Sequence, residues 1–256
     1  MGPPYPPCAG PYGGGPGSAC SRHQERFDTR LFDLAWPSGL AGTGPNEEDV
    51  ADAERRLRDD EKVSRQHRDG WYPSTAGFPW PVDVLVAQWS SAAYGRRQHH
   101  AYARFIIGGL VCGFIGVVGL GVLTGMSLTD WLITFLLPGL PALLDISELA
   151  QNHQRLSTKK QRIEARIQRF WDSELASPGA LCAGDCRTVQ DEAFRLRAAG
   201  RQIPEWFYWV HRDRNESNMR DAAAARRMQF SAARSDPGVS ACTDPGGRKR
   251  GPWFST

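Results

Sequence analysis

The histidines and cysteines of this chain are its most reactive side chains, and their spacing is unsuited to catalysis or metal binding. His99 and His100 would point about 100° apart on a helix, so they would not share one ligand. Cys182 and Cys186 lack the nearby histidines or second cysteine pair of a zinc site, so we expect reduced thiols. The chain also lacks glycine-rich phosphate loops, an HExxH motif and a GxSxG nucleophile turn. We therefore expect a protein that is not an enzyme and that uses no metal and no cofactor.

A stripe of glycines is the more unusual pattern, because it lies within a long apolar segment. Glycines three and four residues apart share one face of a helix, and such small residues let helices approach closely in lipid. The stripe could join copies of the chain or act as a gating hinge, or it could pack against the next apolar segment of the same chain. The residues that we assign to helix contact are Gly109, Gly113, Gly116 and Gly119.

The first of two apolar runs positions this stripe. Residues 105–126 carry no charge over 22 positions, about 33 Å as a helix, which is enough to cross the hydrocarbon core of a bilayer. A second run, residues 128–144, is interrupted only by Asp130, which is more easily explained as a turn residue than as a pore-entrance acid. Since only helices and closed barrels satisfy their backbone in lipid, we expect an all-α integral membrane protein with a transmembrane hairpin at residues 105–145. The residues that predict a kink or local unwinding of the second span are Pro138, Gly139 and Pro141.

The charges that flank the hairpin predict its orientation. The predicted turn, residues 124–130, contains no Lys or Arg, whereas basic residues lie on both outer flanks. By the positive-inside rule, both termini then face the cytoplasm. Over the whole chain 31 basic residues are interspersed with 28 acidic ones, which argues against DNA or RNA as a partner. The flanking basic residues are Arg96, Arg97, Arg104, Arg155, Lys159, Lys160 and Arg162.

The sequence before the hairpin divides into two parts. Residues 1–22 are rich in Pro and Gly and are expected to be disordered, as is the tail at residues 234–256. Residues 23–104 are expected to form a cytoplasmic helical region. Its helices should begin at Asn46 and at Pro81, with an aromatic, Pro-rich loop between them.

Residues 146–233 are expected to form a second cytoplasmic helical region. Apolar residues recur every seven positions over residues 149–170, which favours an amphipathic core helix over a self-associating one. Further helices are expected at residues 185–199 and 216–233. The aromatic run at residues 206–209 could form a hydrophobic core, a ligand-stacking platform or a membrane-interface belt, and a core is the plainer explanation.

Short motifs along both helical regions carry a family resemblance. They are residues 24–36 (QERFDTRLFDLAW), 69–73 (DGWYP), 170–172 (FWD), 190–195 (QDEAFR) and 203–208 (IPEWFY). In their order and spacing across residues 24–225, they resemble the SMODS-associated four-transmembrane effector family of bacteria. The motif residues that we single out are Trp71, Tyr72, Pro73, Gln190, Asp191, Phe194, Trp206 and Tyr208.

The resemblance implies a pore-forming effector of antiphage defence that permeabilises the bacterial inner membrane. It implies the lipid bilayer as a partner, assembly into a homo-oligomer, and activation by a cyclic-oligonucleotide signal or its synthase system. It supplies no catalytic residues. The family pattern has a further hairpin before Glu25, where this sequence has its Pro/Gly-rich start, so we expect one hairpin per chain.

Two other functions fit the same sequence. The hairpin could anchor a scaffold or adaptor protein that never conducts, or the chain could be an inactive, truncated member of the family. Substitutions in the glycine stripe should distinguish a conducting assembly from a simple anchor, because an anchor should tolerate them.

Overall fold

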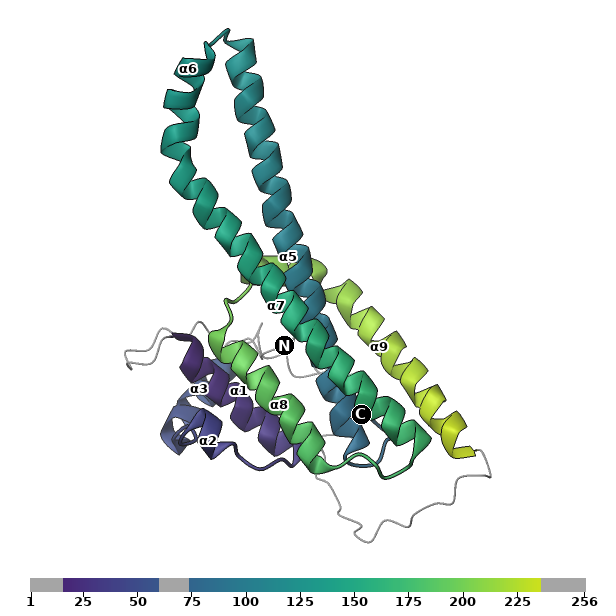
Figure 1. The fold of residues 1–256 in the computed structure, drawn as a ribbon. Helices are drawn as coiled ribbons and strands as arrows, with labels where there is room; N and C mark the ends of the chain where they lie inside the picture. Colours follow the sequence, from purple (N-terminus) through teal and green to yellow (C-terminus); the bar gives the residue numbers. More distant parts are fainter. Residues whose placement is uncertain (1–15, 60–73, 236–256) are drawn as a thin grey trace.

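The computed structural model describes residues 16–59 and 74–235, and every regular element in them is a helix. This confirms the all-α prediction. Figure 1 shows a body of packed helices from which two long helices project side by side as a hairpin. The motif residues Trp71, Tyr72 and Pro73 lie outside the described residues. The elements are α1 (Pro16–Phe32), α2 (Ser38–Ala41), α3 (Glu47–Asp59), α5 (Val82–Leu123), α6 (Leu128–Trp131), the π-helical segment η1 (Leu132–Leu136), α7 (Leu137–Ala176), α8 (Ala183–Ala199) and α9 (Glu205–Ser235).

Helix α5 runs without interruption from the body into the projecting hairpin. It begins directly after Pro81, whose carbonyl accepts a hydrogen bond from the backbone N–H of Leu85. A proline suits this boundary because it has no N–H to leave unsatisfied. The predicted start of a helix at Pro81 is therefore confirmed, and this helix continues into the first apolar run.

The core of the body lies where α5, α7 and α8 meet. Leu85 on α5, Ile167 and Trp171 on α7, and Val189 on α8 are all at most 1% exposed. Burying side chains of this size stabilises the fold by about 1.5–3 kcal/mol each. Helix α9 covers the far side of this core, where Phe230 packs against Trp171. The predicted apolar stripe of α7 is thus buried at Ile163 and half-buried at Leu149, Leu156 and Phe170.

Two element boundaries differ from those predicted. Helix α1 begins at Pro16, so residues 16–22, which we expected to be disordered, are helical, and Ser21 is buried. Helix α9 begins at Glu205 rather than near residue 216, so the aromatic run at residues 206–209 is helical. The carbonyl of Pro204 accepts hydrogen bonds from the N–H groups of the first turn, which makes this proline the start of a helix and not an interruption.

Candidate functional site

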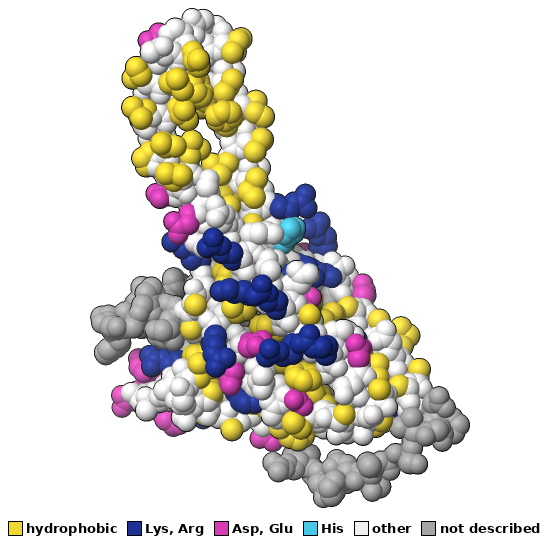
Figure 2. Space-filling view, viewed as in Figure 1, with side chains coloured by type: hydrophobic (Ala, Val, Ile, Leu, Met, Phe, Trp, Pro, Cys, Tyr) yellow, Lys and Arg dark blue, Asp and Glu magenta, His cyan; other side chains and the backbone are white. Residues whose placement is uncertain are grey.

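The upper part of the hairpin exposes an apolar surface that a soluble protein would bury. Helix α5 and the combined segment 128–176 are both long and apolar enough to cross a membrane. Only 11% of the most apolar window of α5 is buried, and none of that of the second segment. A core helix of a soluble protein would have most of that window covered. Figure 2 shows hydrophobic side chains along the projecting hairpin and Lys and Arg side chains on the body below it.

The predicted glycine stripe lies on α5 without a partner in the described part of the chain. A Cβ atom added at Gly109, Gly113, Gly116 or Gly119 would meet no atom within 4 Å. These four glycines therefore do not pack against the second apolar helix of the same hairpin. Their role in contacts between helices stays a prediction, and the partner would have to come from another copy or another protein.

The tip of the hairpin is closed by Trp131 instead. Its indole N–H donates to the carbonyl of Val117 over 3.1 Å, and its ring lies against Gly121. The chain reverses through Gly125, whose φ of +65° favours glycine. Asp130 belongs to the turn: its N–H donates to the Ser127 hydroxyl, which in turn donates to the Asp130 carboxylate. Asp130 is thus part of a helix cap, as a turn residue would be.

Replacing Gly121 with alanine is expected to lower the stability of the protein by about 1–3 kcal/mol, the usual cost of overpacking a close contact. The new methyl would lie too close to the Trp131 ring, with the indole nitrogen only 3.0 Å away, so the ring would have to move and loosen its bond to Val117. Gly119→Ala is the matched control, because its methyl meets no atom within 4 Å. Thermal unfolding in mild detergent would compare the two. Equal midpoints for both variants would contradict the structural role of Trp131.

The predicted kink residues lie in a continuous helix. Pro138 and Gly139 are in the first turn of α7 and Pro141 is inside it, so the backbone does not unwind at these residues. The irregularity lies just before them, in the π-helical segment η1. Prolines and π-helical turns both bend helices because they disturb the regular hydrogen-bond ladder. Figure 1 shows this arm of the hairpin bowing away from α5.

A histidine pair, half-buried His99 and buried His153, joins α5 to α7 where the hairpin enters the body. The Nδ1 atoms of His99 and His153 lie 2.9 Å apart, and the ring of Tyr102 packs edge-on against His153. Burial, together with nearby Lys160 and His153, lowers the pKa of His99 to about 2. Burial, with a contribution from Arg201, also lowers the pKa of His153, whose side chain is fully buried. Both imidazoles are therefore neutral at neutral pH, and one donates to the other.

A polar cluster in the body ties α1 to α8. Fully buried Glu25 accepts from Arg187 over 2.5 Å, from Arg197 over 2.6 Å and from Gln190 over 3.0 Å. Asp28, one turn later on α1, accepts from Arg197 over 2.5 Å and from Gln190 over 2.9 Å. Charge-assisted hydrogen bonds of this kind are the strong ones in proteins. We call these five residues the polar cluster.

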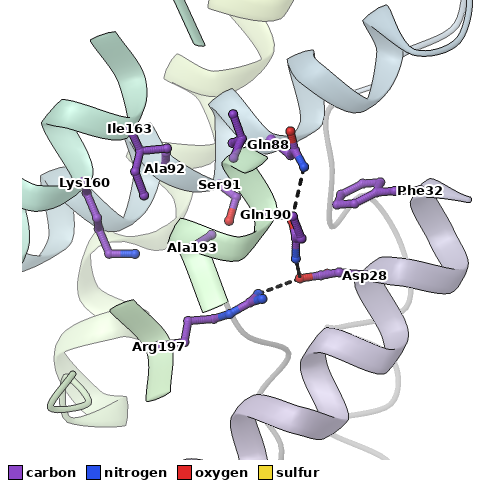
Figure 3. A pocket seen from close by; sticks show the side chains of 11 residues that line it. Asp28, Phe32, Gln88, Ser91, Ala92, Lys160, Ile163, Gln190, Ala193 and Arg197 are labelled. Atoms are coloured by element: carbon purple, nitrogen blue, oxygen red, sulfur yellow. Dashed lines mark hydrogen bonds and ion pairs between the residues drawn. The ribbon is translucent and has the colours of Figure 1, made fainter. Parts of the chain in front are cut away.

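The polar cluster extends to α5 and borders a small cavity. Gln88 on α5 donates to the side chain of Gln190 and to the carbonyl of Cys186. Figure 3 shows Gln88, Gln190, Asp28 and Arg197 in one chain of contacts, with Lys160 across the cavity. The cavity has a volume of about 30 Å³, which is room for water rather than for a larger ligand. Burial and nearby Arg197 lower the pKa of Lys160 to about 8.

The other motif residues described by the structure serve packing and support. Asp191 pairs with Arg187 over 2.7 Å, which orients that arginine in the polar cluster. Phe194 is buried at 5% exposure, and the ring of Tyr208 lies 6.0 Å from that of Tyr94. Trp206 is 54% exposed and packs against Phe105, where the apolar run begins. The aromatic run is therefore only partly core, since Phe207 is buried while Trp206 is not.

Sequence reasoning identified neither the connection of Glu25 to Arg187 and Arg197 nor that of His153 to His99. A signal was present for the first three. Glu25 and Asp28 are three residues apart on α1, and Arg187, Gln190 and Arg197 recur at helical spacing on α8. Such spacing places like side chains on one face but does not say which two faces meet.

Comparisons with known proteins identify the family of this chain. The family described as the SMODS-associating 4TM effector domain matches residues 18–226. A curated relative, a probable CBASS effector molecule from Bacillus cereus (strain VD146), is 25% identical over 199 residues. The alignment covers 77% of this chain and 65% of the relative, so the chain spans less than two-thirds of that protein's length. No solved structure matches. Because the family match extends over most of the sequence, the chain belongs to the SMODS-associating 4TM effector family.

Proposed function

We propose that this protein is an effector of a bacterial antiphage system that permeabilises the inner membrane when a cyclic-oligonucleotide signal is present. The hairpin at residues 105–145 would span the bilayer and the helical body, with both termini, would lie in the cytoplasm. Family membership and the similarity to a probable CBASS effector support the defence role. The basic residues below the hairpin support the orientation, by the positive-inside rule.

The observation that carries this proposal is the exposed apolar hairpin. Its large hydrophobic side chains point outward on both arms: Val122, Leu123 and Leu128 are 76%, 87% and 73% exposed. Monomeric soluble proteins rarely expose contiguous apolar surface on this scale, and such surface usually marks a membrane or protein contact. Both arms are helical, and helices keep backbone hydrogen bonds within the segment, as the hydrocarbon core of a bilayer demands.

Conduction by this hairpin requires several copies. Two helices cannot enclose a channel, so a pore would be lined by hairpins from neighbouring chains. The glycine stripe supports this assembly, because it is the face of α5 where another helix could approach without meeting side chains. In lipid, close approach of backbones is a main source of helix association.

Activation would be transmitted through α5 and α7, because each helix belongs both to the body and to the hairpin. A ligand can shift the closed and open populations only by its difference in affinity for the two states. A signal that alters how α1, α8 or α9 pack on the lower parts of these helices would therefore reorient the hairpin.

Gly113→Leu and Gly116→Leu are each expected to abolish permeabilisation while the protein still inserts. Within one chain these positions face open space, so a leucine fits there. Between copies, its side chain would prevent the close approach of a neighbouring helix. The measurement is membrane potential and dye uptake in bacteria that express the chain with and without a cyclic-oligonucleotide synthase. Depolarisation that needs the synthase is the expected wild-type result.

Val111→Leu is the matched control for these variants. Position 111 is about 200° around the helix from Gly109, and Val111 is already 53% exposed, so a larger side chain there is tolerated in lipid. Intact membranes with confirmed insertion of the wild-type chain would reject a pore and favour a membrane-tethered scaffold. Full activity of both stripe variants would reject the glycine stripe as the contact between copies.

A further inference from the structure

An open pocket lies between α5 and α9, on the part of the body next to the hairpin. Its volume is about 320 Å³, within the usual range of small-molecule sites. Two lining residues come from α5 and four from α9. They are Arg97, Ala101, His211, Arg214, Asn215 and Asn218.

The two arginines of this pocket have no acidic partner among the described residues. Arg97 and Arg214 take part in none of the ion pairs or side-chain hydrogen bonds of the described chain. Arg212, two residues before Arg214 on α9, does have an acidic partner: it pairs with Glu216 over 2.5 Å. No acidic side chain lines the pocket, so no residue of the lining neutralises the positive charge of its two guanidinium groups. This charge can attract an anionic ligand.

Asn215 adds a second and independent observation. Its side chain is only 6% exposed, yet it has no hydrogen-bond partner among the described residues, and it lines the pocket. None of its polar atoms is among the fully buried, unsatisfied ones of the described residues, so the carboxamide is reached from the pocket, where water or a ligand can bond to it. One turn earlier on the same face of α9, Nδ1 of His211 contacts the carbonyl of Phe207 over 3.2 Å, which leaves Nε2 for another contact.

We propose that this pocket binds a phosphodiester group. Arginine forks match the geometry of phosphate oxygens, and carboxamide N–H groups supply neutral donors beside them. The pocket also has room beyond a single anion. Arg97 lies eight residues before Phe105, about 12 Å along the helix, so the site is next to the start of the apolar run. A phosphodiester could reach it on a phospholipid headgroup or on a cyclic oligonucleotide.

The cyclic-oligonucleotide source rests on the proposed function, whereas the phosphodiester chemistry rests on the pocket alone. Binding is therefore measured apart from permeabilisation. The full-length protein in nonionic detergent is titrated with a 3′,3′-linked cyclic dinucleotide in one arm and with short-chain dihexanoyl phosphatidylglycerol in the other. Loss of permeabilisation with binding retained would reject the pore and leave the pocket assignment standing.

The expected result is saturable binding of at least one probe, weakened by at least about tenfold in the double variant Arg97→Gln, Arg214→Gln. Asn215→Ala should weaken binding of the same probe. Arg220→Gln is the matched control, because this arginine is on α9, is 70% exposed and does not line the pocket. Thermal unfolding would establish that each variant is folded.

Each outcome decides the proposal. Binding of the dinucleotide alone assigns the pocket to a soluble signal, and binding of the lipid alone assigns it to a headgroup. No binding of either probe, or equal losses in the Arg220→Gln control and the double variant, would overturn the phosphodiester site.

Discussion

Replacing Glu25 with alanine is expected to lower the free energy of unfolding by about 3–5 kcal/mol, the usual cost of removing one partner from a buried ion pair. Glu25 is fully buried and accepts hydrogen bonds from Arg187, Arg197 and Gln190. Without it, Arg187 and Arg197 stay largely buried with one acid each instead of two. The cost comes mainly from these partly unsatisfied guanidinium groups and from the cavity left on α1.

Glu47→Ala is the matched control for this experiment. Glu47 also pairs with an arginine, Arg26, over 3.0 Å, but its side chain is 89% exposed. Exposed pairs contribute little because water and salt screen them, so this variant should keep wild-type stability within about 1 kcal/mol. Chemical denaturation in mild detergent, followed by far-UV circular dichroism, would compare the two variants. A loss for Glu25→Ala no larger than for Glu47→Ala would show that α1 is not fastened to α8 by the polar cluster.

Local signals in the sequence were sufficient for the starts of α3 and α5. Pro81 marks the start of α5, and acidic residues after Asn46 mark the start of α3, because helix ends are determined by nearby caps and charges. The two apolar runs could also be recognised from the sequence, because they are longer than the apolar segments that a small hydrophobic core requires. The seven-residue periodicity likewise predicted the face of α7 that buries Ile163.

The sequence did not reveal how those helices meet. Glu25 and Arg187 are separated by 162 residues, and no local pattern states that α1 packs on α8. His99 was considered only beside its neighbour His100, but its partner His153 lies on α7 and becomes adjacent only in three dimensions. The start of α9 was misplaced for a related reason: a proline can begin a helix as well as interrupt one.

Acidification from pH 7.5 to 5.5 is expected to destabilise the protein by up to about 3 kcal/mol through His99 and His153. Folding lowers the pKa of both groups below the ordinary value near 6.5, to about 2 for His99. As the pH falls through 6.5, the unfolded chain takes up protons that the folded chain does not. Stability is therefore complete above pH 6.5 and decreases below it, by up to about 1.4 kcal/mol per pH unit for each histidine.

The geometry of the pair gives the reason for this direction. Two protonated rings cannot share the 2.9 Å contact between Nδ1 atoms, because both nitrogens would then carry a hydrogen. Nearby Lys160 and Arg201 also oppose further positive charge. Since the pair joins α5 to α7 at the foot of the hairpin, its protonation would loosen the contact through which the body holds both arms together.

The variant that tests this carries His99→Gln and His153→Gln, which keep polar groups on both helices but cannot titrate. Its stability should change by up to about 3 kcal/mol less than that of the wild-type protein between pH 7.5 and 5.5. His100→Gln serves as the control, because this neighbouring histidine is exposed and should leave the pH dependence intact. An unchanged slope in the double variant, or an equal change in the control, would show that the histidine pair does not govern the response to acid.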